Sequence, residues 1–323
     1  MISSPLAKSS NSAPFCALGI DVGGTKIAVG VVSFPEGKVH ARRTIATLPT
    51  RGGEAVLVDV ERLAGELAAS ARADRLAAQA IGLGVCELVD RAGNVASANC
   101  LDWCGLPVRE RLSQIAPAVL EADVRAAALG EAIFGAGKSF RFFLYLTVGT
   151  GISSCLVLDA KPFTGARGAT GTVASSPLPS ASGSVEAPMP TLEQLASGPA
   201  LVARFNQSGG KAKCGEEVLT AAKAGDTRAV TIVRSAGEAV GAVVGWLVNV
   251  LDPEAVVIGG GLGLSEGLFR ETLLASTRRH IWSELHRGLP ILPAALGSDA
   301  GVIGAATSAW NYFEQADRGS SSG

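Results

Sequence analysis

Apolar residues recur along the chain with two different periods, and these periods predict alternating strands and helices. Residues 17–32 (ALGIDVGGTKIAVGVV) hold two apolar, β-branched runs on either side of a glycine pair, which is typical of two strands joined by a tight turn. Apolar positions at helical spacing over 54–80 predict one amphipathic helix or two. Residues 122–137 predict a helix that begins at Asp123 and ends at glycines. The pattern indicates an α/β protein.

The layout of the first strand pair occurs a second time in the chain. Residues 142–159 (FFLYLTVGTGISSCLVLD) again place a glycine turn between two apolar runs, and Val22 and Gly23 align with Val148 and Gly149. This internal duplication predicts two related halves that face each other. Each turn offers backbone N–H groups, so the two tips could hold a polyphosphate from opposite sides.

Later segments complete the predicted pattern. Residues 255–269 predict a buried strand, a glycine turn and a helix, and Thr191 and Gln194 have the spacing of a capping box at another helix start. The apolar run 239–251 is shorter than the roughly 20 residues that span a bilayer, which favours a buried helix. Residues 172–190 are rich in Ser, Pro and Ala and predict a long surface loop.

Composition narrows the class of protein. A chain of 323 residues is long enough for two domains, and 47% hydrophobic with 18% charged residues is typical of a globular protein. The formal net charge is −1 and the basic residues are scattered, so no electrostatic footprint for nucleic acid or an anionic membrane is present. Six cysteines without a CxxC pair, and an N-terminus without a signal-peptide pattern, favour a reduced, cytoplasmic protein.

The glycine turn after Asp21 differs from two common phosphate-binding motifs. A P-loop requires GxxxxGK[ST] and a dinucleotide fold requires GxGxxG, and both run into a helix. In this chain β-branched residues follow the glycines, so a hairpin is expected in place of either motif.

Taken in order, several segments resemble the ROK family (repressors, open reading frames and sugar kinases). GIDVGGTK is similar to the first phosphate motif of the family, LTVGTGI to the second and VVIGGGL to the adenosine motif. ANCLDWCGLPV and DVRAAALGE fit the segments that carry an Asn before a Gly-Trp turn and the catalytic aspartate. The resemblance runs from about residue 16 to 316. It implies the actin-like ATPase (ribonuclease H-like) fold, with two α/β domains and an interdomain cleft.

This fold suggests where the domains begin and end. We expect an N-terminal actin-like domain over 16–122 plus about 302–316, and a C-terminal actin-like domain over 123–301. Residues 1–15 are expected to form a disordered leader, and residues 317–323 a disordered tail.

The resemblance also implies an activity, which is ATP-dependent phosphorylation of a hydroxyl on a hexose or hexose-like acceptor. Asp123 would be the general base for that hydroxyl, and Asp21 would hold Mg²⁺ directly or through water. A helix N-cap is the alternative role for Asp123, and a helix N-terminus tends to lower a carboxylate pKa.

The expected binding residues fall into three groups. Those for phosphate are Gly23, Gly24, Thr25, Lys26, Thr147, Gly149, Thr150 and Gly151. Those for adenosine are Gly259, Gly260, Gly261 and Leu262. Those for the acceptor are Asn99, Asp123, Glu193, Thr172 and Ser175.

The sequence departs from the family pattern where the sugar would bind. Thr172 and Ser175 stand at the positions of a Glu and a His, and the cysteines that complete the family's zinc site are missing, so no zinc is expected. Ala122 replaces an Asn. Cys86, Glu87 and Leu88 replace a Pro-Gly-Pro turn. These changes predict an unusual or relaxed acceptor and a kinase that is not a standard glucokinase.

Three charged residues are new at positions near the expected acceptor. Glu87, Arg125 and Arg167 could read an amine or a carboxylate on the acceptor, or they could be solvated surface charges.

Two other functions stay open at this point. A non-catalytic relative could sense sugar or nucleotide, and a different actin-like ATPase could share the fold. A DNA-binding repressor is disfavoured, because about 15 residues ahead of the domain cannot hold a winged helix-turn-helix. The expected partners are ATP, a small sugar and a second copy of the chain, since the family is often dimeric, and neither nucleic acid nor a membrane is expected.

Overall fold

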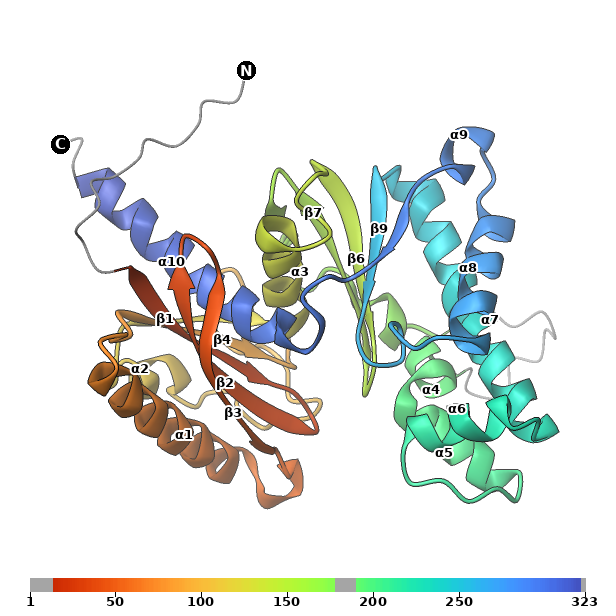
Figure 1. The fold of residues 1–323 in the computed structure, drawn as a ribbon, viewed down its shortest axis with the longest axis horizontal. Helices are drawn as coiled ribbons and strands as arrows, with labels where there is room; N and C mark the ends of the chain where they lie inside the picture. Colours follow the sequence, from red (N-terminus) through yellow and green to blue (C-terminus); the bar gives the residue numbers. More distant parts are fainter. Residues whose placement is uncertain (1–13, 178–189, 321–323) are drawn as a thin grey trace.

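The computed structural model describes residues 14–177 and 190–320, with the backbone alone over 315–320. These residues form two five-stranded sheets, each covered by helices on both faces (Figure 1). The predicted leader lies largely outside the described residues, and so do 178–189 of the predicted surface loop.

The first sheet has the strand order β3-β2-β1-β4-β5. β1 is antiparallel to β2, β2 is antiparallel to β3, and β4 is parallel to both β1 and β5. The strands are β1 (Phe15–Val22), β2 (Lys26–Phe34), β3 (Lys38–Ala46), β4 (Ala80–Val85) and β5 (Ala118–Ala122). Phe15 belongs to β1, so the strand begins one residue inside the segment that was predicted to be a leader.

Two long helices cover the first sheet on opposite faces (Figure 1). They are α1 (Gly53–Ala73) and α10 (Ala300–Ser320), and the short helices near them are η1 (Pro49–Arg51), α2 (Val108–Leu112) and η3 (Gly297–Asp299). Of the residues 54–80 that were predicted to be helical, those up to Ala73 form one helix, and Ala80 begins β4. α10 continues to Ser320, so the prediction of a disordered tail from residue 317 is wrong over its first four positions.

α10 lies directly on the first sheet because glycines leave room for its backbone. A Cβ at Gly19 would overlap the carbonyl oxygen of Val302, and a Cβ at Gly82 would overlap that of Ala305. Side chains of any other residue would push the helix away from the strands. α10 also crosses α3 closely, since a Cβ at Gly304 would overlap the Ala126 carbonyl.

The second sheet has the strand order β10-β9-β6-β7-β8. The strands are β6 (Phe142–Val148), β7 (Ile152–Leu158), β8 (Lys161–Pro162), β9 (Ala255–Gly259) and β10 (Ile291–Pro293). Alternate residues along β6 and β9 face two different cores, one with α3 and one with α7 and α8. The helices are α3 (Asp123–Phe134), η2 (Thr172–Ser175), α4 (Leu192–Ala196), α5 (Gly198–Gln207), α6 (Gly215–Lys223), α7 (Thr227–Leu251), α8 (Leu268–His280) and α9 (Glu284–Arg287).

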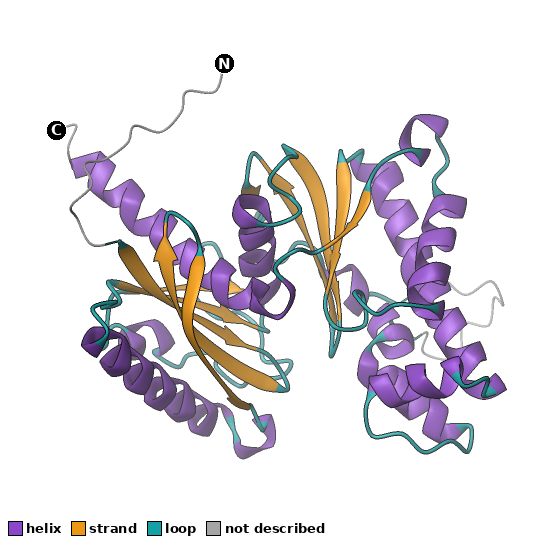
Figure 2. Cartoon of the chain, viewed as in Figure 1, coloured by secondary structure: helices purple, strands orange, loops and turns teal. Residues whose placement is uncertain are grey.

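Several local predictions are confirmed. α3 begins at Asp123 and is followed by Gly135, and α4 has a complete capping box between Thr191 and Gln194. Strand β9 is followed by a glycine turn and then by α8. Figure 2 shows α3 as the helix between the two sheets, and the predicted boundary between the domains at 122 and 123 lies where β5 ends and α3 begins.

α7 contains the apolar run 239–251. Among the described helices it alone is long and apolar enough to cross a membrane by length and composition, and half of the qualifying window is buried inside the fold. Its buried face packs in the core shared by α8 and the second sheet, as predicted for that run.

Candidate functional site

The tips of the two glycine hairpins meet. The hydroxyl oxygens of Thr25 and Thr150 lie 2.8 Å apart, although 125 positions separate these residues in the chain. Thr25 lies in the turn between β1 and β2, and Thr150 lies in the turn between β6 and β7. The duplication seen in the sequence is therefore a pair of hairpins facing each other, one from each sheet.

The first turn is held by short polar contacts. The Gly23 N–H donates to the Lys26 carbonyl at 3.0 Å, and the Thr47 hydroxyl donates to the Gly23 carbonyl at 2.6 Å. Gly24 is close to the Cys100 side chain, because a Cβ at Gly24 would lie 3.0 Å from Cys100 Sγ. Lys26 is exposed at the start of β2, where its charge can face an incoming phosphate.

The second turn is surrounded by helix starts. The Gly149 N–H donates to the Gly151 carbonyl at 2.9 Å, and the Gly149 carbonyl accepts from the Gly198 N–H, at the start of α5, at 2.8 Å. The Glu193 carboxylate, from the first turn of α4, accepts from the Ile152 N–H at 2.8 Å. One carboxylate oxygen of Glu193 therefore supports this turn, and the acceptor contact expected from the sequence stays a prediction.

The glycine turn after β9 packs against the second hairpin. Gly259 pairs with Thr147 across β9 and β6, and the Leu262 N–H donates to the Val148 carbonyl at 3.0 Å. Gly260 has a φ of 81°, and a Cβ there would overlap the Val148 carbonyl, so only glycine fits. The predicted adenosine residues and the predicted phosphate residues 147–151 are thus brought together.

Asp21 and Asp123 form the charged centre beside the first hairpin. Asp21 stands near the end of β1 and Asp123 at the first position of α3. Burial, followed by the nearby Asp21 carboxylate, raises the pKa of Asp123 to about 7. The expected lowering by the helix N-terminus is therefore outweighed, because desolvation and a like charge both favour the neutral form.

The alternative role of Asp123 as a helix N-cap is wrong. Ala122 occupies the N-cap position, and the Asp123 carboxylate accepts from the N–H of Val124, its neighbour, at 2.6 Å. This local bond leaves one carboxyl oxygen without a partner among the described residues.

Asp21 lies against the first turn of α10. A Cβ at Gly301 would overlap the Asp21 carboxyl group, so glycine lets the helix start approach this charge. Burial raises the pKa of Asp21, and the charges of Lys26 and Arg42 partly offset that effect. Arg42 itself pairs with Asp299, just before α10, at 2.6 Å.

Glu87 and Arg125 are buried, so neither is a solvated surface charge. Each side chain is 4% exposed. The Glu87 carboxylate accepts backbone N–H groups of the segment 99–101. The Arg125 guanidinium donates to the Glu121 carboxylate at 2.5 Å and to the carbonyls of Gly168 and Val89 at 2.8 and 2.7 Å.

These bonds also exclude the interpretation that Glu87 and Arg125 read an amine or a carboxylate on the acceptor. All three guanidinium nitrogens of Arg125 have partners within the protein, and so do both carboxylate oxygens of Glu87. Neither group is free to read a charge on an acceptor. Arg167 is exposed, and no contact of its side chain distinguishes between the two interpretations.

The other predicted acceptor residues are exposed. Asn99 lies in the bend at 99–100, and Thr172 and Ser175 lie in η2, next to the buried Ala174. The side chain of Asn99 makes no hydrogen bond within the described part of the chain, so its amide is available to a ligand.

Sequence reasoning missed two contributors to this site. Thr47 holds the first turn through its hydroxyl and its N–H, which donates to the Thr25 carbonyl at 3.1 Å. The Cys100 thiol packs on Gly24 and forms a hydrogen bond with the thiol of Cys86. Burial raises the pKa of Cys86. No sequence motif includes Thr47, because its partners lie across a strand pair. The only sequence signal for Cys100 was its position within the segment that carries the Asn before the Gly-Trp turn.

Over residues 14–177 and 190–320, no group of three or more His, Cys, Asp or Glu side chains is arranged to hold a metal ion. Asp21 and Asp123 offer two carboxylates beside the first hairpin, which suits an ion that takes its other ligands from water and phosphate.

The whole sequence can now be compared with known proteins. The model of the ROK family matches residues 17–311. The chain belongs to the ROK family. This ROK protein is 33% identical to the bifunctional enzyme NanE/NanK of Brucella melitensis biotype 1 over 298 residues, which cover 92% of the chain and 54% of that relative. It is 30% identical to the glucokinase of Streptomyces coelicolor over 317 residues, which cover 90% of the chain and 96% of that enzyme.

The ROK chain spans about half the length of the NanE/NanK relatives that it matches. Among solved structures, the ROK family glucokinase of Streptomyces griseus in complex with glucose and AMPPNP has a TM-score of 0.77 at 28% identity. That match covers 92% of this chain and 99% of the glucokinase. The fold of this ROK protein is the predicted actin-like ATPase fold.

Proposed function

We propose that this protein is an ATP-dependent sugar kinase that transfers the γ-phosphoryl group to a hydroxyl of a hexose or hexose-like acceptor. The observation that carries the proposal is the meeting of the two glycine hairpins at Thr25 and Thr150, with Asp21 and Asp123 beside the first of them. Its relatives support the same class, since they bear the names glucokinase and NanE/NanK.

In this proposal the triphosphate lies between the two turns. Backbone N–H groups and hydroxyls at 23–26 and 147–151 would bind its oxygens, and the turn 259–262 would hold the adenosine. Phosphoryl transfer passes through a loose transition state, so positioning and charge neutralisation account for most of the catalysis. Lys26, exposed at the first turn, would neutralise part of that charge.

Asp123 would accept the proton of the acceptor hydroxyl. Its pKa of about 7 leaves the carboxylate about half deprotonated near neutral pH, and a base with a pKa near the working pH is the most effective. A general base of this kind contributes roughly 10²–10⁴ in rate.

Mg²⁺ fits the donor set beside the first hairpin. The Asp21 carboxylate raises the pKa of Asp123, so negative charge is concentrated here that a divalent cation would neutralise, and Mg²⁺ prefers carboxylate, phosphate and water oxygens. Asp21 would hold the ion, directly or through water. When bound, Mg²⁺ supplies charge neutralisation at the phosphate oxygens.

The acceptor would differ from that of a standard glucokinase. Thr172 and Ser175 offer short hydroxyls where the family pattern has Glu and His, and the Glu193 carboxylate is engaged at the second turn. Each missing partner for a buried hydroxyl costs about 1–3 kcal/mol, so glucose should bind weakly. Asn99 is the acceptor contact whose side chain is free.

The decisive experiment measures ADP release from ATP and Mg²⁺ with neutral, N-acetylated, amino and acidic hexoses. Transfer to one or several of these sugars, with glucose a poor acceptor, supports the proposal. No ADP release with any sugar, together with a thermal shift on adding sugar or nucleotide, would favour the alternative of a non-catalytic sensor. Efficient glucose phosphorylation would refute the unusual acceptor.

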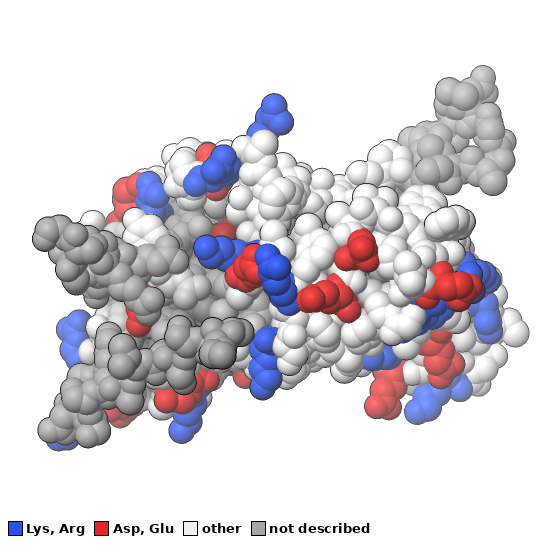
Figure 3. Space-filling model, turned by 90° about the horizontal axis from the view of Figure 1, so that it is seen from above, with Lys and Arg blue, Asp and Glu red and all other residues white. Residues whose placement is uncertain are grey.

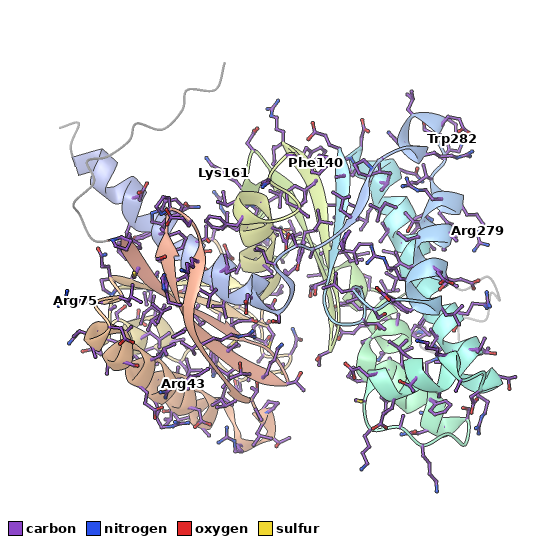
Figure 4. The ribbon with its side chains drawn as sticks, viewed as in Figure 1. Arg43, Arg75, Phe140, Lys161, Arg279 and Trp282 are labelled. Carbon is purple, nitrogen blue, oxygen red and sulfur yellow. The ribbon has the colours of Figure 1, made fainter. Side chains whose placement is uncertain are left out.

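We also propose a cytoplasmic homodimer. On the face drawn in Figure 3, basic and acidic side chains are interspersed, which suits neither nucleic acid nor an anionic membrane. Large apolar side chains are exposed near the end of α7 and at α9, and Figure 4 places Trp282 on that outer edge, away from α3. These side chains are Trp246, Val250, Trp282 and Leu285. Light scattering at several concentrations would test the dimer.

A further inference from the structure

A buried carboxylate organises the segment that carries Asn99. Glu87 follows β4 by two residues, and its side chain is 4% exposed. One oxygen accepts the N–H groups of Cys100 and Leu101 at 2.5 and 2.8 Å. The other accepts the N–H of Asn99 at 2.9 Å and also the hydroxyl of Ser97. Three consecutive backbone N–H groups therefore converge on one charge.

The segment 97–101, which we term the 97–101 loop, touches the phosphate-binding turn on its other side. Cys100 Sγ would lie 3.0 Å from a Cβ at Gly24, so the loop and the turn are in close contact. Beyond the loop the chain enters the core, with Leu101 1% exposed and Trp103 fully buried and donating to the Gly53 carbonyl at 2.8 Å. The far end is anchored by apolar packing, and the near end depends on Glu87.

We propose that Glu87 is a positioning residue: it shapes the 97–101 loop and so fixes Asn99 for the acceptor and Cys100 against Gly24. This inference rests on the proposed sugar kinase function. It also explains why the Pro-Gly-Pro turn of the family pattern can be absent here. The hydrogen bonds of the Glu87 carboxylate hold the neighbouring loop in place of a rigid turn.

The chemistry of the contact requires a carboxylate. Four donors converge on two oxygens, and an ionised carboxylate is an acceptor at both. In Glu87→Gln one oxygen becomes an NH₂ group, which would face N–H or O–H donors and leave them without an acceptor. Buried donors without a partner are unfavourable, so the 97–101 loop should move away.

The test compares Glu87→Gln with Glu131→Gln in the full chain. Glu131 is a matched control, because it is fully buried and its carboxylate accepts the N–H groups of Ala136, Ala295 and Leu296 at 2.8–3.0 Å, none of which belongs to the 97–101 loop. The measurements are amide hydrogen exchange at 99–101, KM for the acceptor, KM for ATP, and kcat.

We expect Glu87→Gln to lose exchange protection at 99–101 and to raise the acceptor KM by about tenfold or more, with the ATP KM changed by less than about threefold. Glu131→Gln should lower thermal stability without changing the acceptor KM. Ser97→Ala, which removes one of the four donors, should shift the acceptor KM in the same direction by less. Glu87→Asp, which keeps two acceptor oxygens, should recover part of the exchange protection at 99–101.

Two results would overturn the proposal, and they are distinct from failure of the kinase function. Unchanged exchange at 99–101 in Glu87→Gln refutes the shaping of the loop, whatever the enzyme does. An equal rise of the acceptor KM in Glu131→Gln refutes a specific role in the site. Absence of transfer to every sugar by the unaltered chain refutes the proposed function itself, and the acceptor role of Glu87 with it.

Discussion

Asp123 should make the protein less stable as the pH rises from 5 to 8, and Asp123→Asn should remove most of that dependence. The pKa of Asp123 is about 7 in the folded protein, against an ordinary value of 3.8. In the unfolded chain the carboxyl group thus loses its proton near pH 4, and in the folded protein near pH 7. The folded state therefore binds more protons across this window, and its stabilisation declines as the pH rises through 7.

The magnitude follows from the difference in pKa. About three units at 1.4 kcal/mol each give an upper limit of about 4 kcal/mol, reached below pH 4. Between pH 5 and pH 8 the expected loss is about 2–3 kcal/mol. That loss is a large part of the stability of an ordinary domain, so it should be visible in equilibrium unfolding.

Urea unfolding at pH 5, 6.5 and 8, at constant ionic strength and without nucleotide, measures this slope. Asp226→Asn is the matched control, because Asp226 caps α7 and its Arg228 partner lowers the pKa of Asp226 to about 2, far below the window. The control should keep the slope of the unaltered protein, and Asp123→Asn should flatten it. Equal slopes in Asp123→Asn and the unaltered protein would refute the reasoning about burial.

Four further perturbations test other parts of the site. Gly260→Ala should destabilise the fold by about 1–3 kcal/mol and weaken ATP binding, because its φ is 81° and a Cβ would overlap the Val148 carbonyl; thermal melts with and without ATP would measure both. Arg125→Met should lower stability by about 2–4 kcal/mol, since it leaves two buried carbonyls unpartnered and removes the ion pair with Glu121, and an unchanged urea midpoint would contradict this. Thr25→Val and Thr150→Val should show a coupling of about 0.5–1.5 kcal/mol in a double-mutant cycle, and additivity would argue against their contact. Chelation of Mg²⁺ should abolish ADP release. The melting temperature of the protein without nucleotide should stay the same.

Much of the fold follows from short-range patterns in the sequence. The two hairpins, the start of α3 at Asp123 and the capping box at Thr191 each depend on residues within a few positions of one another. Local periodicity and cap chemistry are enough to predict such features. The buried helix α7 could also be predicted from the sequence, because the apolar run 239–251 is too short to span a bilayer and ends at Asp252-Pro253.

The burial and the partners of the charged residues near the site could not be predicted from such local patterns. Glu87 finds its partners 10–14 positions along the chain, and Arg125 finds two of its partners 36 and 43 positions away. Only the packed structure brings these groups together, so sequence alone could not distinguish surface charges from internal ones. The pKa of Asp123 is similar, because it depends on burial and on Asp21, about a hundred positions earlier.

The position of α10 has a consequence for how the protein is made. The helix that packs on the first sheet at Gly19 and Gly82 follows every strand of both sheets in the chain. Before residues 300–320 have been synthesised, the face of the earliest strands that α10 covers is covered only in part, by Phe134 of α3 against Phe34. We therefore expect the amino-terminal half to need chaperone protection until that helix has emerged, and the carboxy-terminal half, whose sheet and covering helices are contiguous in the chain, to fold first.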